Sequence, residues 1–121
     1  MGHMRHHAII VSGTPCQDTT VERAHAKAVE IWGESAPQQV THILNAPING
    51  YKSFAILPDG SKEGWSESNT GDGRRDTFIA WMESCRYKDR SSPLGWVEVQ
   101  YDDDERDTRV VRHSDERGVE E

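Results

Sequence analysis

The chain has 121 residues, 34% of them hydrophobic and 29% charged, with a formal net charge of -7 at pH 7. This length fits one domain, and four tryptophans in an otherwise polar chain indicate a compact core with a solvated tail rather than full disorder. Residues 102–121 hold nine acidic and four basic side chains, which leaves 12 acidic and 10 basic in residues 1–101. Non-specific nucleic-acid binding is disfavoured, because that affinity comes from lysines and arginines that contact phosphates.

The chain has no run of 18 apolar residues and no signal-peptide pattern. We therefore expect a soluble cytoplasmic protein with no membrane partner. Cys16 and Cys85 are expected to be free thiols in that reducing compartment. Residues 1–3 resemble the remnant of a cloning tag, with the natural start at Met4.

The first expected elements are a buried strand and an amphipathic helix. Residues 7–12 form a short apolar run that ends at Gly13, as a buried strand does. Residues 19–22 read Thr-Thr-Val-Glu, a capping box that predicts a helix start. Gly33 suits a left-handed helix end. The apolar face of this helix consists of Val21, Ala24, Ala28, Ile31 and Trp32.

A β-hairpin is expected next. Residues 40–48 and 51–57 flank Asn49-Gly50, the dipeptide that most readily gives positive φ at both centres of a two-residue turn. Pro47 has no amide donor, so the earlier strand should lie at a sheet edge or carry a bulge. Residues 58–60, Pro-Asp-Gly, end the second strand in a turn.

A second helix and a last strand complete the expected core. Phe78, Trp81, Met82 and Cys85 repeat at helical spacing, which predicts a helix that starts near Asp72 and runs to about Tyr87. Residues 96–101 alternate as a half-buried strand does. From residue 102 onward we expect an acidic disordered tail, with a short strand over residues 108–113 as the alternative.

This element order predicts an α+β fold, specifically a ferredoxin-like βαββαβ sandwich with one antiparallel sheet and two helices on one face. Residues 4–101 would form the single domain. Residues 102–121 would form the acidic tail.

The stretch at residues 60–75 is the main candidate site. The amides of residues 71–73, at the expected helix start, could hold a phosphate or carboxylate together with nearby side chains. The favoured alternative is structural: Asp72 caps the helix and Trp65 folds back to cover the core. A P-loop is excluded because the Gly-Lys-Ser/Thr ending is missing. The candidate ligand-binding side chains are Glu63, Trp65, Asp72, Arg74 and Arg75.

Metal and nucleophile chemistry have weaker support. His6 and His7 are adjacent on the first strand, so they point to opposite faces and cannot both join His42 in one metal site. Cys85 lies on a buried helical stripe, where a core role is commoner than reactivity. Cys16 has no base near it in sequence. The sequence therefore assigns no catalytic residue, no metal and no cofactor.

The strings NGYKSFAILPDGSKEGWSES and GDGRRDTFIAW, within residues 49–81, resemble small proteins of unassigned function that phage and prophage genomes encode. The resemblance covers roughly residues 6–101 and implies an accessory protein that acts inside a bacterial cell. The expected function is non-enzymatic binding of a host or phage protein through the open sheet face, the hairpin or the Trp65 loop. The alternative is a small anion-binding or hydrolytic protein that uses residues 60–75.

Overall fold

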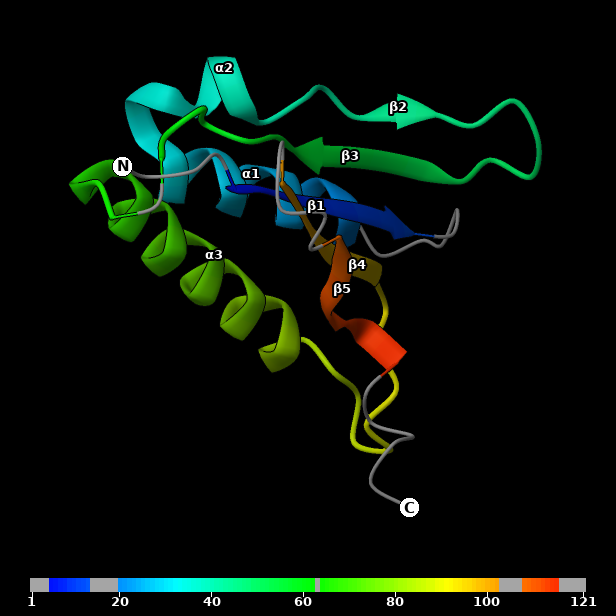
Figure 1. Ribbon diagram of the computed structural model, residues 1–121. Helices are drawn as coiled ribbons and strands as arrows, with labels where there is room; N and C mark the ends of the chain where they lie inside the picture. The colour runs from blue at the N-terminus through cyan, green and yellow to red at the C-terminus, as the bar shows by residue number, and fades with distance from the viewer. Residues whose placement is uncertain (1–4, 14–19, 63, 103–107, 116–121) are drawn as a thin grey trace.

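The computed structural model describes residues 5–13, 20–62, 64–102 and 108–115. It shows an α+β fold with one open antiparallel sheet in the strand order β2-β3-β1-β4-β5 (Figure 1). The strands are β1 (Arg5–Gly13), β2 (Leu44–Asn45), β3 (Lys52–Ile56), β4 (Gly95–Asp102) and β5 (Arg109–His113). The helices are α1 (Thr20–Trp32), the 3-10 turn η1 (Gly33–Ser35), α2 (Ala36–Gln39) and α3 (Ser66–Ser84).

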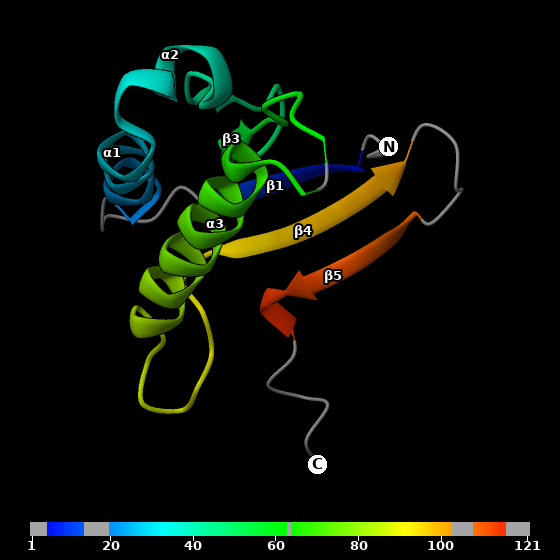
Figure 2. The same cartoon turned by 60° about the vertical axis from the view of Figure 1, so that its left-hand side comes forward.

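The two long helices, α1 and α3, cover one face of the sheet (Figure 2). Phe78 of α3 lies at the centre of the core, with its ring centroid 6.0 Å from that of Trp32 and 6.4 Å from that of Phe54. Both helices therefore share one core with the sheet rather than packing separately. The buried sheet residues in that core are Ile9, Val11, Phe54, Ile56 and Trp96.

Helix α1 confirms the predicted amphipathic helix, with Val21, Ala24, Ala28 and Trp32 buried. Thr19 lies outside the described residues. Gly33 has φ of +58°, the left-handed conformation expected at a helix end. The chain does not leave the helix layer there, because η1 and α2 continue it as far as Gln39.

The hairpin is confirmed, and Asn49 and Gly50 are both left-handed as expected, with φ of 65° and 68°. The two-residue turn is wrong: Asn45 pairs with Lys52 and the amide of Ala46 donates to the carbonyl of Tyr51, so the loop comprises the four residues 47–50. The first strand is much shorter than residues 40–48, because only β2 pairs in a ladder and Val40 adds an isolated bridge to Ile56. As Pro47 predicts, β2 lies at the edge of the sheet.

The predicted start of the second helix is wrong by about two turns. Helix α3 begins at Ser66, so the amides of residues 71–73 lie in the helix interior. Glycine and serine have poor helix propensity, so the sequence of residues 66–73 does not indicate a helix. Tertiary packing stabilises it: Ser68 and Gly71 are buried, and a Cβ at Gly71 would lie 3.4 Å from Oδ2 of Asp59. The small residues therefore allow a close approach of helix and loop.

The sheet has five strands, so the prediction of a four-stranded ferredoxin-like sandwich is wrong. The extra strand, β5, pairs with β4 through Val97–His113, Glu98–Arg112, Val99–Val110 and Gln100–Arg109. A disordered tail from residue 102 is thus wrong for Arg109–His113, where the valines and the Arg112–Glu98 contact outweigh the acidic composition. Residues 1–4, 103–107 and 116–121 lie outside the described residues.

Candidate functional site

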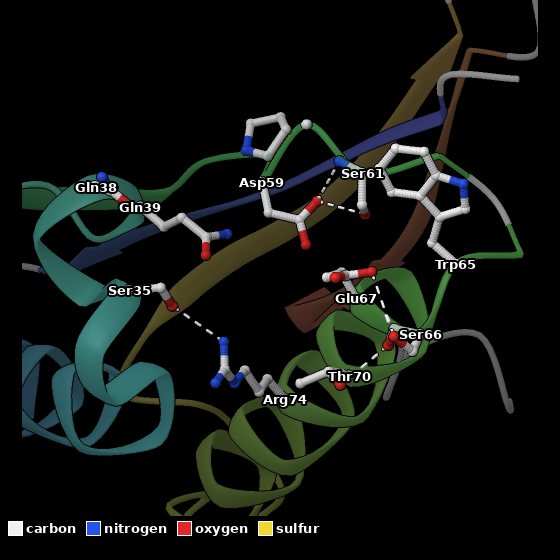
Figure 3. Close-up of a pocket in the computed structure, with 12 residues that line it drawn as sticks. Ser35, Gln38, Gln39, Asp59, Ser61, Trp65, Ser66, Glu67, Thr70 and Arg74 are labelled. Carbon is white, nitrogen blue, oxygen red and sulfur yellow. Dashed lines mark hydrogen bonds between the residues drawn. The ribbon is translucent and has the colours of Figure 1, made fainter.

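A cleft of about 580 Å³ opens between α2, the loop that follows β3, and the first turns of α3 (Figure 3). In Figure 3, α2 and the start of α3 lie on opposite sides of this cleft. Most of the lining side chains are polar, and one large aromatic ring stands among them. The lining residues are Ser35, Gln38, Gln39, Pro58, Asp59, Gly60, Ser61, Trp65, Ser66, Glu67, Thr70 and Arg74.

Trp65 occupies the N-cap position of α3 with extended backbone, at φ of -77° and ψ of 153°. Its side chain is 49% exposed, so the prediction that the ring folds back as a buried cover is wrong. The ring instead lines the cleft, and Nζ of Lys62 lies 6.0 Å from its centroid. The cleft therefore offers an apolar face that a ligand can reach.

Two carboxylates, those of Asp59 and Glu67, point into the cleft in Figure 3. Oδ1 of Asp59 accepts hydrogen bonds from the amide of Ser61 at 2.9 Å and from its hydroxyl at 2.7 Å. These bonds fix the loop and the orientation of the carboxylate. Oε1 of Glu67 accepts a longer bond of 3.3 Å from the Ser66 hydroxyl. Both side chains are on exposed residues, so their lone pairs remain accessible from solvent.

Arg74 closes the opposite end of the cleft. Its Nη1 donates to the Ser35 hydroxyl oxygen at 3.0 Å, and that hydroxyl donates to the carbonyl of Trp32 at 2.9 Å. The chain of bonds ties α3 to the end of α1. On the same wall, the Gln39 amide donates to the carbonyl of Leu57 at 2.9 Å. The guanidinium of Arg74 therefore lines the cleft and is fixed by one hydrogen bond, and it carries four further N–H donors.

Arg75 does not line this cleft, although the sequence grouped it with Arg74. Successive helical residues differ by about 100° in direction, and Arg75 points toward the sheet instead. There its Nε lies 3.3 Å from Oε2 of Glu98, a residue only 2% exposed. Asp72 pairs with Arg75 on the helix surface. The two residues belong to a structural ion-pair cluster rather than to an anion cradle at a helix start.

Arg112 completes that cluster from β5. Its Nε donates to Oε1 of Glu98 at 2.6 Å, and its Nη1 lies 3.0 Å from Oδ1 of Asp76. The hydrogen bond with Glu98 raises the pKa of Arg112 above its ordinary value. The buried carboxylate therefore has a cation on each side, as a buried charge requires.

The remaining sequence candidates do not gather into a site. Glu63 and Cys16 lie outside the described residues. Cys85 is partly buried at the end of α3, with Nη2 of Arg23 at 3.9 Å from its Sγ. Within residues 5–13, 20–62, 64–102 and 108–115, no three His, Cys, Asp or Glu side chains are placed to hold a metal ion. In the same ranges, no helix is long and apolar enough to cross a membrane.

Two of the candidate residues from the sequence, Trp65 and Arg74, line the cleft, but the sequence predicted neither the cleft nor its other half. Nothing in the pattern of residues 35–39 connects them with residues 58–74, because only the bend at Gly33 brings the two segments together. The sequence placed Asp59 in a turn after the strand; its carboxylate accepts a hydrogen bond from the Ser61 amide and also faces the cleft. The chain matches no protein-family model, no curated protein and no solved structure.

Proposed function

We propose that the protein is a non-enzymatic binding protein whose cleft receives a basic side chain, lysine or arginine, of a protein partner. One observation carries the proposal: the half-exposed ring of Trp65 lines the same cleft as the carboxylates of Asp59 and Glu67. An aromatic face beside accessible carboxylates attracts a cation through both ring quadrupole and charge.

The size and polarity of the cleft support this ligand. A volume of about 580 Å³ lies within the range of sites that enclose a small molecule or an extended side chain with its neighbouring backbone. The Gln38 side chain on α2 has donors and an acceptor suited to a peptide backbone. Arg74 is held by Ser35 at the far end, where it would limit how deep a cation enters.

The charge of the whole chain supports a basic protein partner. A net charge of -7 steers positively charged surfaces toward the protein before contact, and such steering raises association rates. The resemblance to phage and prophage proteins supports a host or phage protein as that partner, met in the cytoplasm of a bacterial cell.

The test is a titration of isotope-labelled full-length protein, followed by amide and indole NMR signals. The probes are acetyl-Gly-Arg-Gly-amide, the matched acetyl-Gly-Glu-Gly-amide, and inorganic phosphate. We expect saturable shifts at the Trp65 indole and at the amides of residues 59–61 with the arginine peptide alone. Trp65→Ala and Glu67→Gln should each weaken that binding by about tenfold, the scale of one partly desolvated cation–π or charge contact.

Matched controls lie outside the cleft. Tyr51→Ala removes another half-exposed aromatic ring, and Glu30→Gln removes an exposed carboxylate on α1; neither should change the affinity for the arginine peptide. Equal shifts from the glutamate and arginine peptides, or wild-type affinity in Trp65→Ala, would rule out the proposed recognition.

A small anion is the second candidate, favoured by one observation at the start of α3. The first amides of a helix have no intrahelical partner, and the described side chain at the N-cap, Trp65, makes no capping hydrogen bond. Arg74 lines the same cleft. Saturable phosphate shifts confined to residues 66–68 and lost in Arg74→Ala would support this anion-binding or hydrolytic alternative. The neighbouring carboxylates of Asp59 and Glu67 oppose it.

A further inference from the structure

A second, much smaller cavity adjoins the cleft, between β1, the loop that follows β3, and α3. Its volume is about 10 Å³, which is room for one water molecule. The loop residues Pro58, Asp59 and Ser61 line both the cleft and this cavity, so the two share a wall. The residues that line the small cavity are Arg5, His7, Pro58, Asp59, Ser61, Ser68 and Arg75.

Asp59 and Arg75 approach each other at this cavity without a direct ion pair. A Cβ on Gly71 would lie 3.4 Å from Oδ2 of Asp59 and 3.3 Å from Nη1 of Arg75, so the two atoms face the same small space. In the part of the chain that the structure describes, the ion pairs of Arg75 go to Asp72 and Glu98 instead. Two polar groups that share a cavity but are too far apart for a direct bond are suited to a bridging water.

Water fits the chemistry of this cavity better than an ion does. The side chains of Arg5 and Arg75 disfavour a cation, and the carboxylate of Asp59 disfavours an anion. A water molecule can instead donate to the carboxylate and accept from the guanidinium. The hydroxyl of Ser68, a residue only 9% exposed, offers a third partner, and three is the usual number for a buried water.

We propose that one ordered water molecule occupies this cavity and joins Oδ2 of Asp59 to Nη1 of Arg75. Arg75 is then a positioning residue for the cleft, a role that rests on the function proposed above. Ser61 holds Oδ1 of Asp59 at 2.9 and 2.7 Å, and the water holds Oδ2, so both oxygens are fixed before a ligand binds. A fixed carboxylate loses less conformational freedom when it receives a basic side chain, which strengthens binding.

The other end of the bridge is fixed as well. The side chain of Arg75 is 13% exposed, and its Nε lies 3.3 Å from Oε2 of Glu98. Glu98 in turn accepts from Nε of Arg112 at 2.6 Å. The water therefore extends the buried ion-pair cluster as far as the wall of the cleft. The bridge also gives a reason for glycine at position 71, because a Cβ there would crowd both bridged groups.

Gly71→Ala tests the bridge, and Gly73→Ala is its matched control. Both variants exchange glycine for the better helix former inside α3, but a Cβ at Gly73 would meet nothing within 4 Å. Crystal structures of the wild type and of Gly73→Ala should each show a water within about 3.2 Å of both Oδ2 of Asp59 and Nη1 of Arg75. Gly71→Ala should lack that water, and its Asp59 carboxylate should be displaced.

The affinity for acetyl-Gly-Arg-Gly-amide tests the positioning role. The dissociation constant should rise about fivefold in Gly71→Ala, the scale of ordering one side chain, and should stay within about twofold of the wild type in Gly73→Ala. Equal affinities of the two variants would overturn the positioning role.

The wild-type crystal structure decides on the water even if Gly71→Ala fails to fold. A cavity without a water peak, a peak coordinated as an ion, or a direct ion pair between Asp59 and Arg75 would overturn the proposal. A wild-type chain that does not bind the arginine peptide would overturn the proposed function instead. The crystal structures would then decide by themselves on the water and on the position of Asp59.

Discussion

The two faces of the sheet differ in a way that reverses the usual rule for antiparallel sheets. Every charged residue of the five described strands lies on the side of α1 and α3, and the outward positions of the open side hold none. The charged residues are Arg5, Lys52, Glu98, Asp102, Arg109 and Arg112. In β4 the side chains of Trp96, Glu98 and Gln100 are buried, while Val97 and Val99 lie on the open face. Strand alternation shows that two faces differ but does not show which one is covered.

The covered face can hold charge because the side of helix α3 that faces the sheet is apolar near its end and charged near its middle. Its second half contributes Phe78, Ile79 and Met82 to the apolar core. At its middle, Arg75 lies beside Glu98, where Arg112 approaches from β5. A buried carboxylate with two cations is tolerated, whereas the same group alone would not be. Charges on this face are thus located where the helix has charges to match them.

The largest expected difference between the faces comes from two neighbouring isoleucines. Ile9→Ala should lower the free energy of unfolding by about 3 to 4 kcal/mol, because Ile9 is fully buried and truncation leaves a cavity. Ile10→Ala should cost less than about 1 kcal/mol, because Ile10 is half exposed. Urea unfolding of the two variants and the wild type measures both costs. Equal costs would contradict the assignment of covered and open faces.

A smaller effect tests the charges on the covered face. Glu98→Ala should destabilise the protein by about 3 kcal/mol, because it leaves Arg75 and Arg112 without their buried partner. The control, Glu83→Ala, breaks an exposed pair with Arg86 and should cost less than about 1 kcal/mol. The same unfolding experiment measures both variants. If Glu98→Ala costs no more than its control, solvent reaches the cluster and the pairing does not stabilise it.

The smallest effect lies at the border of the covered face, where Lys52 of β3 donates to Glu22 of α1 at 2.5 Å. That hydrogen bond lowers the pKa of Glu22 below its ordinary value of 4.5. The stabilisation is therefore present at neutral pH and is lost as pH falls below about 4.5 through the folded-state pKa. Both groups are well exposed, so the pair contributes less than about 0.5 kcal/mol.

Lys52→Gln should accordingly destabilise the protein slightly at pH 7 and not at pH 3, with unfolding free energies measured at both pH values. Lys88→Gln removes an exposed lysine elsewhere and serves as the charge-matched control. A penalty that persists undiminished at pH 3 would show that Lys52 acts through packing of its aliphatic stem instead.

Local signals predicted the elements whose cause is local. The left-handed backbone of Asn49 and Gly50, the apolar stripe of α1 and the β1 run depend on neighbouring residues, and all three were predicted correctly. The start of α3 and the existence of β5 depend on distant contacts instead. Ser66 to Gly73 has little helical preference of its own, and β5 is an acidic-flanked segment that pairs with β4.

The candidate site shows the same limit. Trp65 and Arg74 could be selected because an aromatic ring and arginines are unusual in a glycine-rich loop. Arg75 looked equivalent to Arg74 until the helix start was known, since the helical phase decides which of the two faces the cleft. The sequence did not indicate that Gln38 and Gln39 line a cleft, because their position there depends on the path of the chain after α1.

The central position of β1 has a consequence for how the protein forms on the ribosome. Ile9, at the start of the chain, pairs with Glu98, roughly 90 positions later, and such distant pairing slows folding. At about 5 to 20 residues per second, β1 emerges several seconds or more before β4 is synthesised. During that interval β1 lacks the neighbour on that side and exposes Ile9, Ile10 and Val11. A nascent chain stalled before Gly95 should consequently bind chaperones that recognise extended apolar segments.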